Sequence, residues 1–97
     1  MAVKDNVLGF QWDKGNLDKS YQKHGITPEE AEEIFLDEKL KVESDVAHSQ
    51  TEERLIAIGQ TQQKVVLLVV FTTRSKTLRI ISARKANQKE KQKYAQT

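Results

Sequence analysis

The stretch that decides the fold is Leu78–Ala86, LRIISARKA. Its first residues are strand formers, so we predict a strand over Leu78–Ile81 that turns at Ser82 into a final helix. Because arginine is almost never fully buried without a partner, the cations of this stretch should emerge at the sheet edge, close to whatever the protein binds. These cations are Arg79, Arg84 and Lys85.

Alternation and apolar runs predict four more strands before this stretch. The run VVLLVVF is the most strand-like segment of the chain and should form the centre of the sheet. The segment after the polar loop that holds His48 is apolar on both faces, which is typical of a covered strand. The expected strands are Gly9–Trp12, Lys39–Glu43, Glu53–Gly59 and Val65–Phe71, with turns over Gly59–Gln63 and Thr72–Lys76.

Two helices are predicted near the N-terminus. The first runs over about residues 14–23 after an Asp13 cap, and Gly25 suits the left-handed residue that ends a helix. The second begins at the capping box of Thr27 and Glu30, with Pro28 at its first position, and runs to about Phe35 or Leu36. The final helix presents Ala86, Glu90 and Tyr94 at helical spacing. The expected order is β-α-α-β-β-β-β-α in one α+β domain over residues 1–97.

Composition excludes several classes of protein. The 97 residues include no cysteine and only two histidines, so we expect neither disulfides nor a metal site, and no cofactor motif is present. The N-terminal MAVKDNVLGFQ lacks the apolar segment of a signal peptide. Since the longest apolar run is too short to span a bilayer, we expect no membrane contact and a cytoplasmic location.

Charge is unevenly distributed along the chain. Residues 28–53 hold ten acidic residues and two lysines, whereas residues 54–97 hold ten lysines and arginines and one glutamate. This asymmetry predicts a nucleic-acid-binding face on one side. The alternative is an ordinary solvated surface.

Several polar residues fall at the ends of the expected elements and suit phosphodiester chemistry. RNA carries its own nucleophile, the 2′-hydroxyl, so a metal-free site must position the phosphate, stabilise its extra charge and move a proton. The arginine fork does the first two, and histidine titrates near neutral pH. A nucleic-acid binder without catalysis would show the same residue types. The candidates are Lys14, His24, His48, Arg54, Arg79, Arg84 and Tyr94.

Several motifs in order carry a resemblance to a known family. They are FQWDKGNL at Phe10–Leu17, KHGI at Lys23–Ile26, EEAEEIFLD at Glu29–Asp37, HSQTEER at His48–Arg54, Ile58-Gly59, and RIISARKA at Arg79–Ala86 with Glu90 and Tyr94 behind it. Together they resemble the BrnT family of toxins from bacterial toxin–antitoxin systems. The resemblance implies a RelE-like fold with helices on one side of a mostly antiparallel sheet. It also implies a metal-independent ribonuclease that stops growth by cutting RNA.

The resemblance further implies roles and partners. Arg54 and Arg84 would contact the scissile phosphate, and Arg79 would join them or pair with Glu53. His24 would be the first acid or base candidate and His48 the second, although each could only cap a backbone end. Tyr94 would support the site or pack in the core. Lys14 would support the site, while Lys85, Lys89 and Lys93 would attract the RNA backbone.

The implied partners are an RNA substrate and a BrnA-like antitoxin, in a heterotetramer that binds promoter DNA through the antitoxin. An alternative from another class remains open. The chain could be a non-catalytic nucleic-acid-binding or antitoxin-binding module, a decayed toxin, that binds RNA in a salt-sensitive manner without cutting it.

Overall fold

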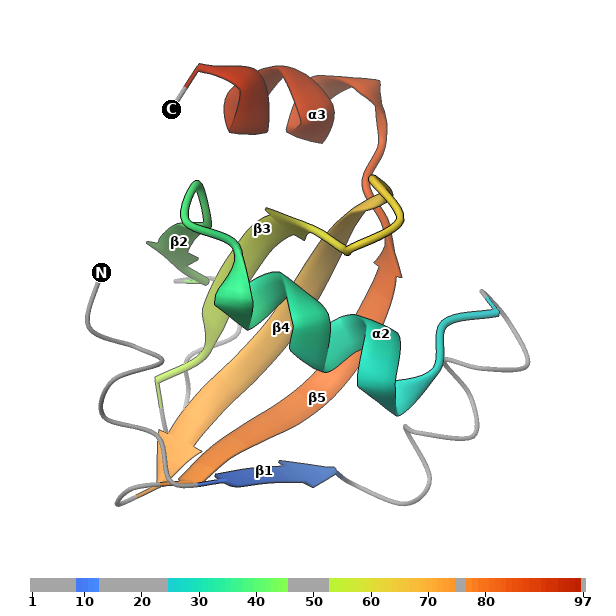
Figure 1. The fold of residues 1–97 in the computed structure, drawn as a ribbon. Coiled ribbons are helices and arrows are strands. Elements are labelled where there is room, and N and C mark those ends of the chain that lie inside the picture. The colour runs from blue at the N-terminus through green and yellow to red at the C-terminus, as the bar shows by residue number, and fades with distance from the viewer. Residues whose placement is uncertain (1–8, 13–24, 46–52, 75–76, 97) are drawn as a thin grey trace.

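The computed structural model describes residues 9–12, 25–45, 53–74 and 77–96, which form a five-stranded sheet with helices on it (Figure 1). The strand order is β1-β5-β4-β3-β2, and every neighbouring pair is antiparallel except the parallel pair β1 and β5. The elements are β1 Gly9–Trp12, helix α2 Pro28–Glu33, 3₁₀ helix η2 Ile34–Leu36, β2 Lys41–Ser44, β3 Leu55–Gln60, β4 Val66–Arg74, β5 Thr77–Lys85 and helix α3 Gln88–Ala95.

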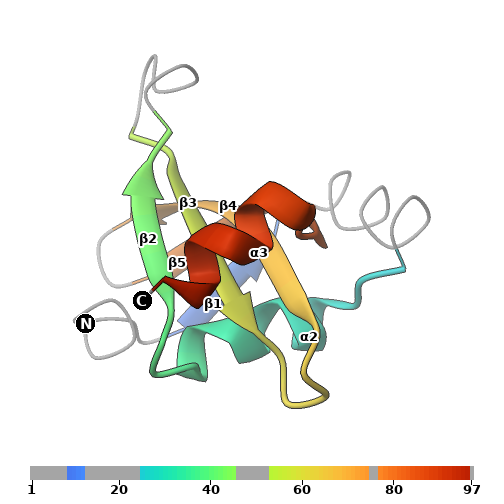
Figure 2. The same ribbon diagram turned by 90° about the horizontal axis from the view of Figure 1, so that it is seen from above.

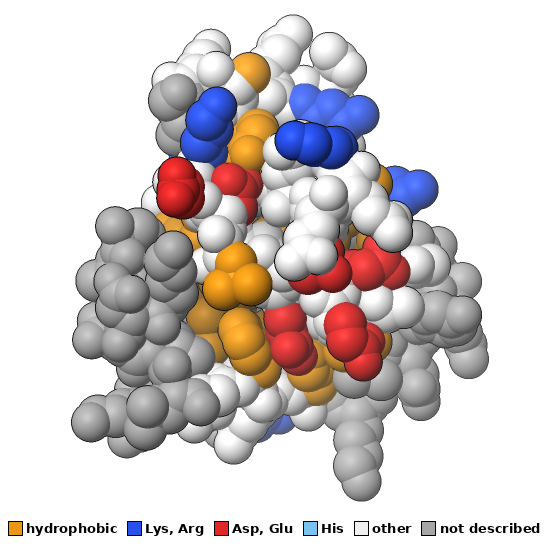
Figure 3. Space-filling model, in the orientation of Figure 1, with side chains coloured by type: hydrophobic (Ala, Val, Ile, Leu, Met, Phe, Trp, Pro, Cys, Tyr) orange, Lys and Arg blue, Asp and Glu red, His pale blue; other side chains and the backbone are white. Residues whose placement is uncertain are grey.

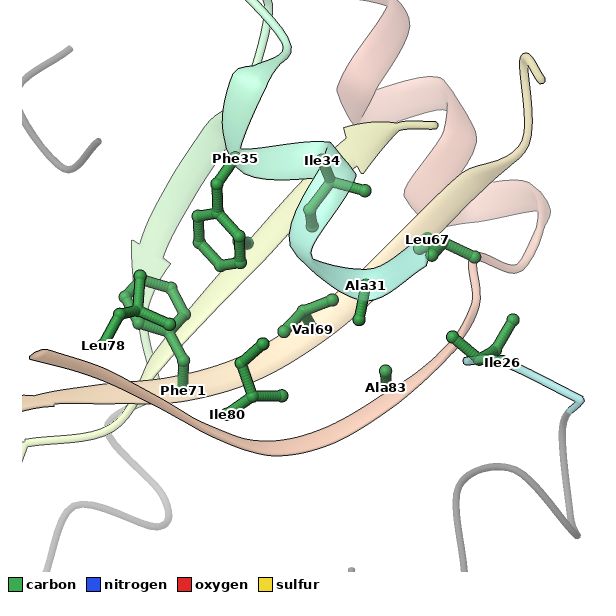
Figure 4. Packing of buried hydrophobic residues seen from close by; sticks show 11 residues of the cluster. Ile26, Ala31, Ile34, Phe35, Leu67, Val69, Phe71, Leu78, Ile80 and Ala83 are labelled. Carbon is green, nitrogen blue, oxygen red and sulfur yellow. The ribbon is translucent and has the colours of Figure 1, made fainter. Parts of the chain in front are cut away.

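The core lies between α2 and one face of the sheet (Figure 4). Ala57, Val69 and Ala83 are cross-strand partners on that face, and all three are buried. Phe35 of η2 packs edge-on against Phe71 of β4, with ring centroids 5.2 Å apart. Burial of these apolar side chains, at about 25 cal/mol per Å², is the main favourable term in the stability of the sheet.

The strand predictions are confirmed with shifts of a few residues at the ends. All of the VVLLVVF run except Val65 lies in β4, the third strand of five, as expected for the centre of the sheet. Phe10 and Trp12 pair with Leu78 and Ile80, whose side chains are buried, so both aromatic residues face the core side.

The start of the second helix is also confirmed. The Thr27 hydroxyl accepts from the Glu30 amide, and the Glu30 carboxylate accepts in return from the Thr27 amide. This α-helix ends at Glu33 and continues as the 3₁₀ turn to Leu36. Gly25 has the left-handed φ of 69° that was predicted. The helix expected over residues 14–23 lies outside the described residues.

The prediction that β5 ends at Ile81 and that Ser82 caps the last helix is wrong. β5 continues to Lys85, because Ser82 to Lys85 pair with β4 and Ala83 is buried in the core. The helix begins at Gln88 instead, and Asn87 caps it. The pairing with β4 outweighs the local capping preference of Ser82.

The resemblance implied that the helices lie on one side of the sheet, but α2 and α3 lie on different sides. Two ion-pair partners of α3 are Arg84 and Glu43, whose cross-strand neighbours Leu68 and Ile56 point away from the face that α2 covers. Figure 2 shows α3 crossing over the sheet while α2 lies along another side. α3 contains no buried residue, and its ion pairs with Arg84 and Glu43 attach it to the sheet.

Gly59 allows η2 to lie directly on β3, and we expect Gly59→Ala to destabilise the fold by about 1–3 kcal/mol. A Cβ at this position would lie 2.9 Å from both Ile34 Cβ and Leu40 Cδ1. Gly9→Ala is the matched control, because no atom lies within 4 Å of its added Cβ. Urea unfolding of both variants tests this, and equal stabilities would contradict the proposed close approach.

Candidate functional site

A β-bulge in β5 brings two of the predicted arginines to one face of the sheet. Val70 pairs with Ser82 and Phe71 with Ile80, so Ile81 is an extra residue on β5. Without it, Arg79 and Arg84, five positions apart, would point to opposite faces. With it, they pair with Thr72 and Leu68, which are four positions apart on β4 and therefore share a face.

Arg54 lies on the same face. It precedes Leu55, which pairs with Phe71, so Arg54 lies opposite Thr72. The Asp45 amide donates to the Arg54 carbonyl at 2.8 Å, so the pairing of β2 and β3 continues to this residue. We call the sheet face that carries Arg54, Arg79 and Arg84, opposite α2, the arginine face.

The spacing within the arginine face follows from strand geometry. Arg54 and Arg79 flank Thr72 across two strand spacings, on the order of 10 Å. Arg84 lies about 13–14 Å further along the sheet, at about 3.4 Å per residue. Thr72 between the first two is 2% exposed, and its hydroxyl donates to the Glu53 carbonyl at 2.8 Å. Because arginine side chains are long, those at these spacings can contact one phosphodiester segment from its two ends.

Arg84 forms a bidentate ion pair with Glu90 of α3. Nη1 donates to Oε1 at 2.8 Å and Nη2 donates to Oε2 at 2.7 Å. Nη1 also donates to the Lys85 carbonyl at 3.2 Å. The hydrogen bond and the opposite charge raise the pKa of Arg84, and the bond from Arg84 lowers the pKa of Glu90 despite its burial. Both groups are therefore charged at neutral pH.

Tyr94 lies on α3 and bonds to Asp37 rather than to Arg84. Its hydroxyl donates to Asp37 Oδ2 at 2.6 Å. Asp37 also accepts from the Gln60 amide at 2.8 Å and from the Lys39 amide at 2.9 Å. Burial opposes ionisation of Asp37, but the bonds from Tyr94 and the two amides outweigh it and lower the pKa of this carboxyl.

Burial and the Asp37 carboxylate raise the pKa of Tyr94 to about 12, so the phenol is protonated at neutral pH. We expect a corresponding stability loss in alkali. A group whose pKa is raised from 10.0 to about 12 on folding contributes stability that is complete below pH 10 and is lost as the pH rises from 10 to about 12.

Tyr94→Phe removes that contribution and serves as the comparison. Urea midpoints of both proteins between pH 8 and pH 12 test the expectation. The stability difference should be largest at pH 8 and should shrink towards pH 12. A difference that stays constant across this range would contradict it.

The predicted RNA-binding lysines do not share a face. Lys85 pairs with Leu67, so it points to the side of the sheet that α2 covers. Lys93 of α3 forms an ion pair with Glu43 at 3.0 Å, and Lys41 Nζ donates to the Lys93 carbonyl. Lys89 is exposed on α3.

Opposite charges separate in space as they do in sequence. Figure 3, which shows the α2 side, has acidic side chains gathered over the middle of the molecule and basic side chains towards α3. Two of the acids are already used to hold this side together, since Glu32 accepts from the Trp12 indole and Glu33 from the Gln62 amide. The acidic α2 side therefore has a structural use, and the arginine face lies behind it.

Three predicted site residues, Lys14, His24 and His48, lie outside the described residues. Within the described part of the chain, no cluster of three or more His, Asp or Glu side chains could hold a metal ion. No helix in that part is both long and apolar enough to cross a membrane.

Sequence reasoning assigned no role to two residues that the structure makes central, Glu90 and Asp37. Glu90 lies four residues before Tyr94, so helical spacing indicated that the two share a helix face. Its partner, however, is Arg84, and this pair forms because the helix begins at Gln88. Asp37 follows η2 directly. Its role, to accept bonds from β3 and α3, depends on long-range contacts that the sequence does not show.

Comparison with known proteins adds two findings. Residues 12–90 match the family described as "Ribonuclease toxin, BrnT, of type II toxin-antitoxin system". The chain is also similar to the crystal structure of the Brucella abortus ribonuclease toxin, BrnT, with a TM-score of 0.63 and 26% sequence identity, over 84% of this chain and 100% of the Brucella chain. No curated protein matches the chain.

Proposed function

Because the chain belongs to the BrnT family of ribonuclease toxins of type II toxin–antitoxin systems, we propose that it is an endoribonuclease that cuts RNA without a metal ion. In this proposal it acts in the cytoplasm, where cleavage of messenger RNA inhibits translation and growth. A BrnA-like antitoxin neutralises it, in a heterotetramer that binds promoter DNA through the antitoxin.

The observation that carries the proposal is the arginine face, where the bulge in β5 brings Arg79 and Arg84 to the side of the sheet that also carries Arg54. In the proposed reaction the 2′-hydroxyl attacks the adjacent phosphorus and displaces the 5′-oxygen. Arg54 and Arg84 hold the scissile phosphate, and Arg79 helps to stabilise the extra negative charge. Stabilisation of this kind is often the largest single contribution to catalysis.

Proton transfer is assigned to His24 first and His48 second, because imidazole titrates near neutral pH. Tyr94, with a pKa of about 12, is suited to donate a hydrogen bond and not to act as a base. Lys14, Lys85, Lys89 and Lys93 draw the RNA backbone to the protein through charge, which predicts a salt-dependent affinity.

The test is cleavage of a defined RNA in excess EDTA. We expect discrete fragments from the natural protein, a rate reduced about 100-fold or more by Arg84→Ala, and one reduced by about 10²-fold or more by His24→Ala. Lys39→Ala is the matched control, because it removes one exposed positive charge that has no assigned role. Equal activity of Arg84→Ala and Lys39→Ala would contradict the proposed site.

One observation favours the non-catalytic alternative. The end of the Arg84 fork is already occupied by Glu90, as expected for a structural ion pair. A decayed toxin of this kind would bind RNA with salt-sensitive affinity and yield no fragments, with or without ribosomes in the assay.

A further inference from the structure

The guanidinium of Arg84 has a second edge that its ion pair leaves open. Arginine carries five N–H donors. The bonds to Glu90 and to the Lys85 carbonyl use both donors of Nη1 and one of Nη2. Within the described part of the chain, the Nε–H and the second Nη2–H have no acceptor, and they lie together on one edge of the planar group. The Arg84 side chain is 39% exposed, so a ligand can reach it.

Glu90 is itself held in place. Its Oε1 accepts from the Asn87 amide at 2.8 Å, and its own amide donates to Asn87 Oδ1 at 2.9 Å. The Glu90 side chain is only 16% exposed. The capping box at the start of α3 therefore fixes the carboxylate, and the carboxylate fixes the plane of the guanidinium.

We propose that Glu90 is a positioning residue: it holds Arg84 end-on so that the Nε–Nη2 edge takes a phosphodiester oxygen pair of the RNA. The inference rests on the proposed function and adds a residue to it. A carboxylate beside a phosphate-binding arginine also weakens the net attraction for RNA. The benefit of Glu90 must therefore lie in geometry, since a misplacement of about 1 Å can cost about 10²-fold in rate.

Geometry and charge predict opposite results for Glu90→Gln. If Glu90 only masked Arg84, its neutralisation would raise kcat/KM, because the arginine face would gain net positive charge. If Glu90 positions Arg84, kcat falls by about 10-fold to 100-fold while KM for RNA is unchanged or lower. The double variant gives a further test of positioning. If Glu90 acts through Arg84, Glu90→Gln should cause no additional loss of kcat in an Arg84→Ala background.

Glu43→Gln is the matched control. It removes one carboxylate charge from a second ion pair of α3, the one with Lys93, and leaves Arg84 untouched. We expect its kcat to stay within about threefold of the natural protein, as for a surface ion pair of small energetic value. Thermal unfolding of all variants checks that each is folded before its rates are compared.

A readout independent of cleavage completes the test. The ¹⁵N Nε–Hε resonance of Arg84, identified by its loss in Arg84→Lys, should shift when an uncleavable 2′-O-methyl RNA is added. The shift should shrink in Glu90→Gln and persist in Glu43→Gln. An Arg84 resonance whose chemical shift does not change when RNA is added, or full activity of Glu90→Gln, would overturn the inference and leave the ribonuclease proposal standing. A shift that shrinks in Glu90→Gln, without any cleavage by the natural protein, would overturn the ribonuclease proposal and support the role of Glu90 in phosphate binding.

Discussion

Phe35→Ala is expected to lower the free energy of unfolding by about 3–5 kcal/mol, the usual cost of truncating a buried phenylalanine. The Phe35 side chain is 2% exposed. Its ring packs at 86° against Phe71 with centroids 5.2 Å apart, and at 49° against Phe10 with centroids 5.7 Å apart. Truncation removes both ring contacts and leaves a cavity between η2 and the sheet. Because small domains are stable by about 5–15 kcal/mol, this loss is a large fraction of the total stability.

Leu36→Ala is the control for this prediction. Leu36 is the next residue of the same 3₁₀ turn, but it is 65% exposed. We expect its substitution to change stability by less than about 0.5 kcal/mol. Urea unfolding monitored by far-UV circular dichroism compares the two variants. Similar midpoints for both would mean that η2 does not pack on the sheet as described.

Asp37→Ala should cost about 2–3 kcal/mol, because three donors lose a charged acceptor at once. These donors come from three places, the Tyr94 hydroxyl of α3, the Gln60 amide at the end of β3 and the Lys39 amide of the following turn. The loss should be greatest at α3, which contains no buried residue and loses its bond from Tyr94. Relative to the natural protein, amide hydrogen exchange in Asp37→Ala should therefore accelerate more in α3 than in β4.

Glu38→Ala removes a neighbouring exposed carboxylate and should leave stability nearly unchanged. The pH dependence gives a second check. Since the pKa of Asp37 is lowered from 3.8 on folding, its contribution is complete above that value and is lost as the pH falls through the lowered pKa. The natural protein and Asp37→Ala should therefore converge in stability in acid. A constant gap between them would contradict the assigned bonds.

Local patterns predicted most of the sheet and the start of α2. The capping box of Thr27 and Glu30 forms from residues three apart, so the sequence alone contains both partners. The apolar run of β4 likewise identifies a central strand by its composition. These features depend on short-range chemistry, and the structure confirms them.

The features that shape the candidate site depend on long-range pairing instead. Ser82 is a good helix cap in isolation, but ladder bonds to β4 keep it in a strand. The extra residue at Ile81 leaves no mark in the sequence, because a bulge is defined by what the neighbouring strand does. For the same reason, sequence reasoning named Arg84 and Tyr94 and missed their partners Glu90 and Asp37.

The parallel pairing of β1 with β5 has a consequence for the order of folding. Residues 13–76 separate the two strands, whereas β3, β4 and β5 follow one another as antiparallel neighbours. Closing the longer loop costs more chain entropy, so β1 should dock after the rate-limiting barrier has been crossed. Phe10→Ala in β1 should then accelerate unfolding and leave the folding limb of the chevron unchanged, with a φ-value near zero. The first strand of the chain would thus join the sheet late in folding. Its contacts would set the lifetime of the folded protein and leave the rate at which it forms unchanged.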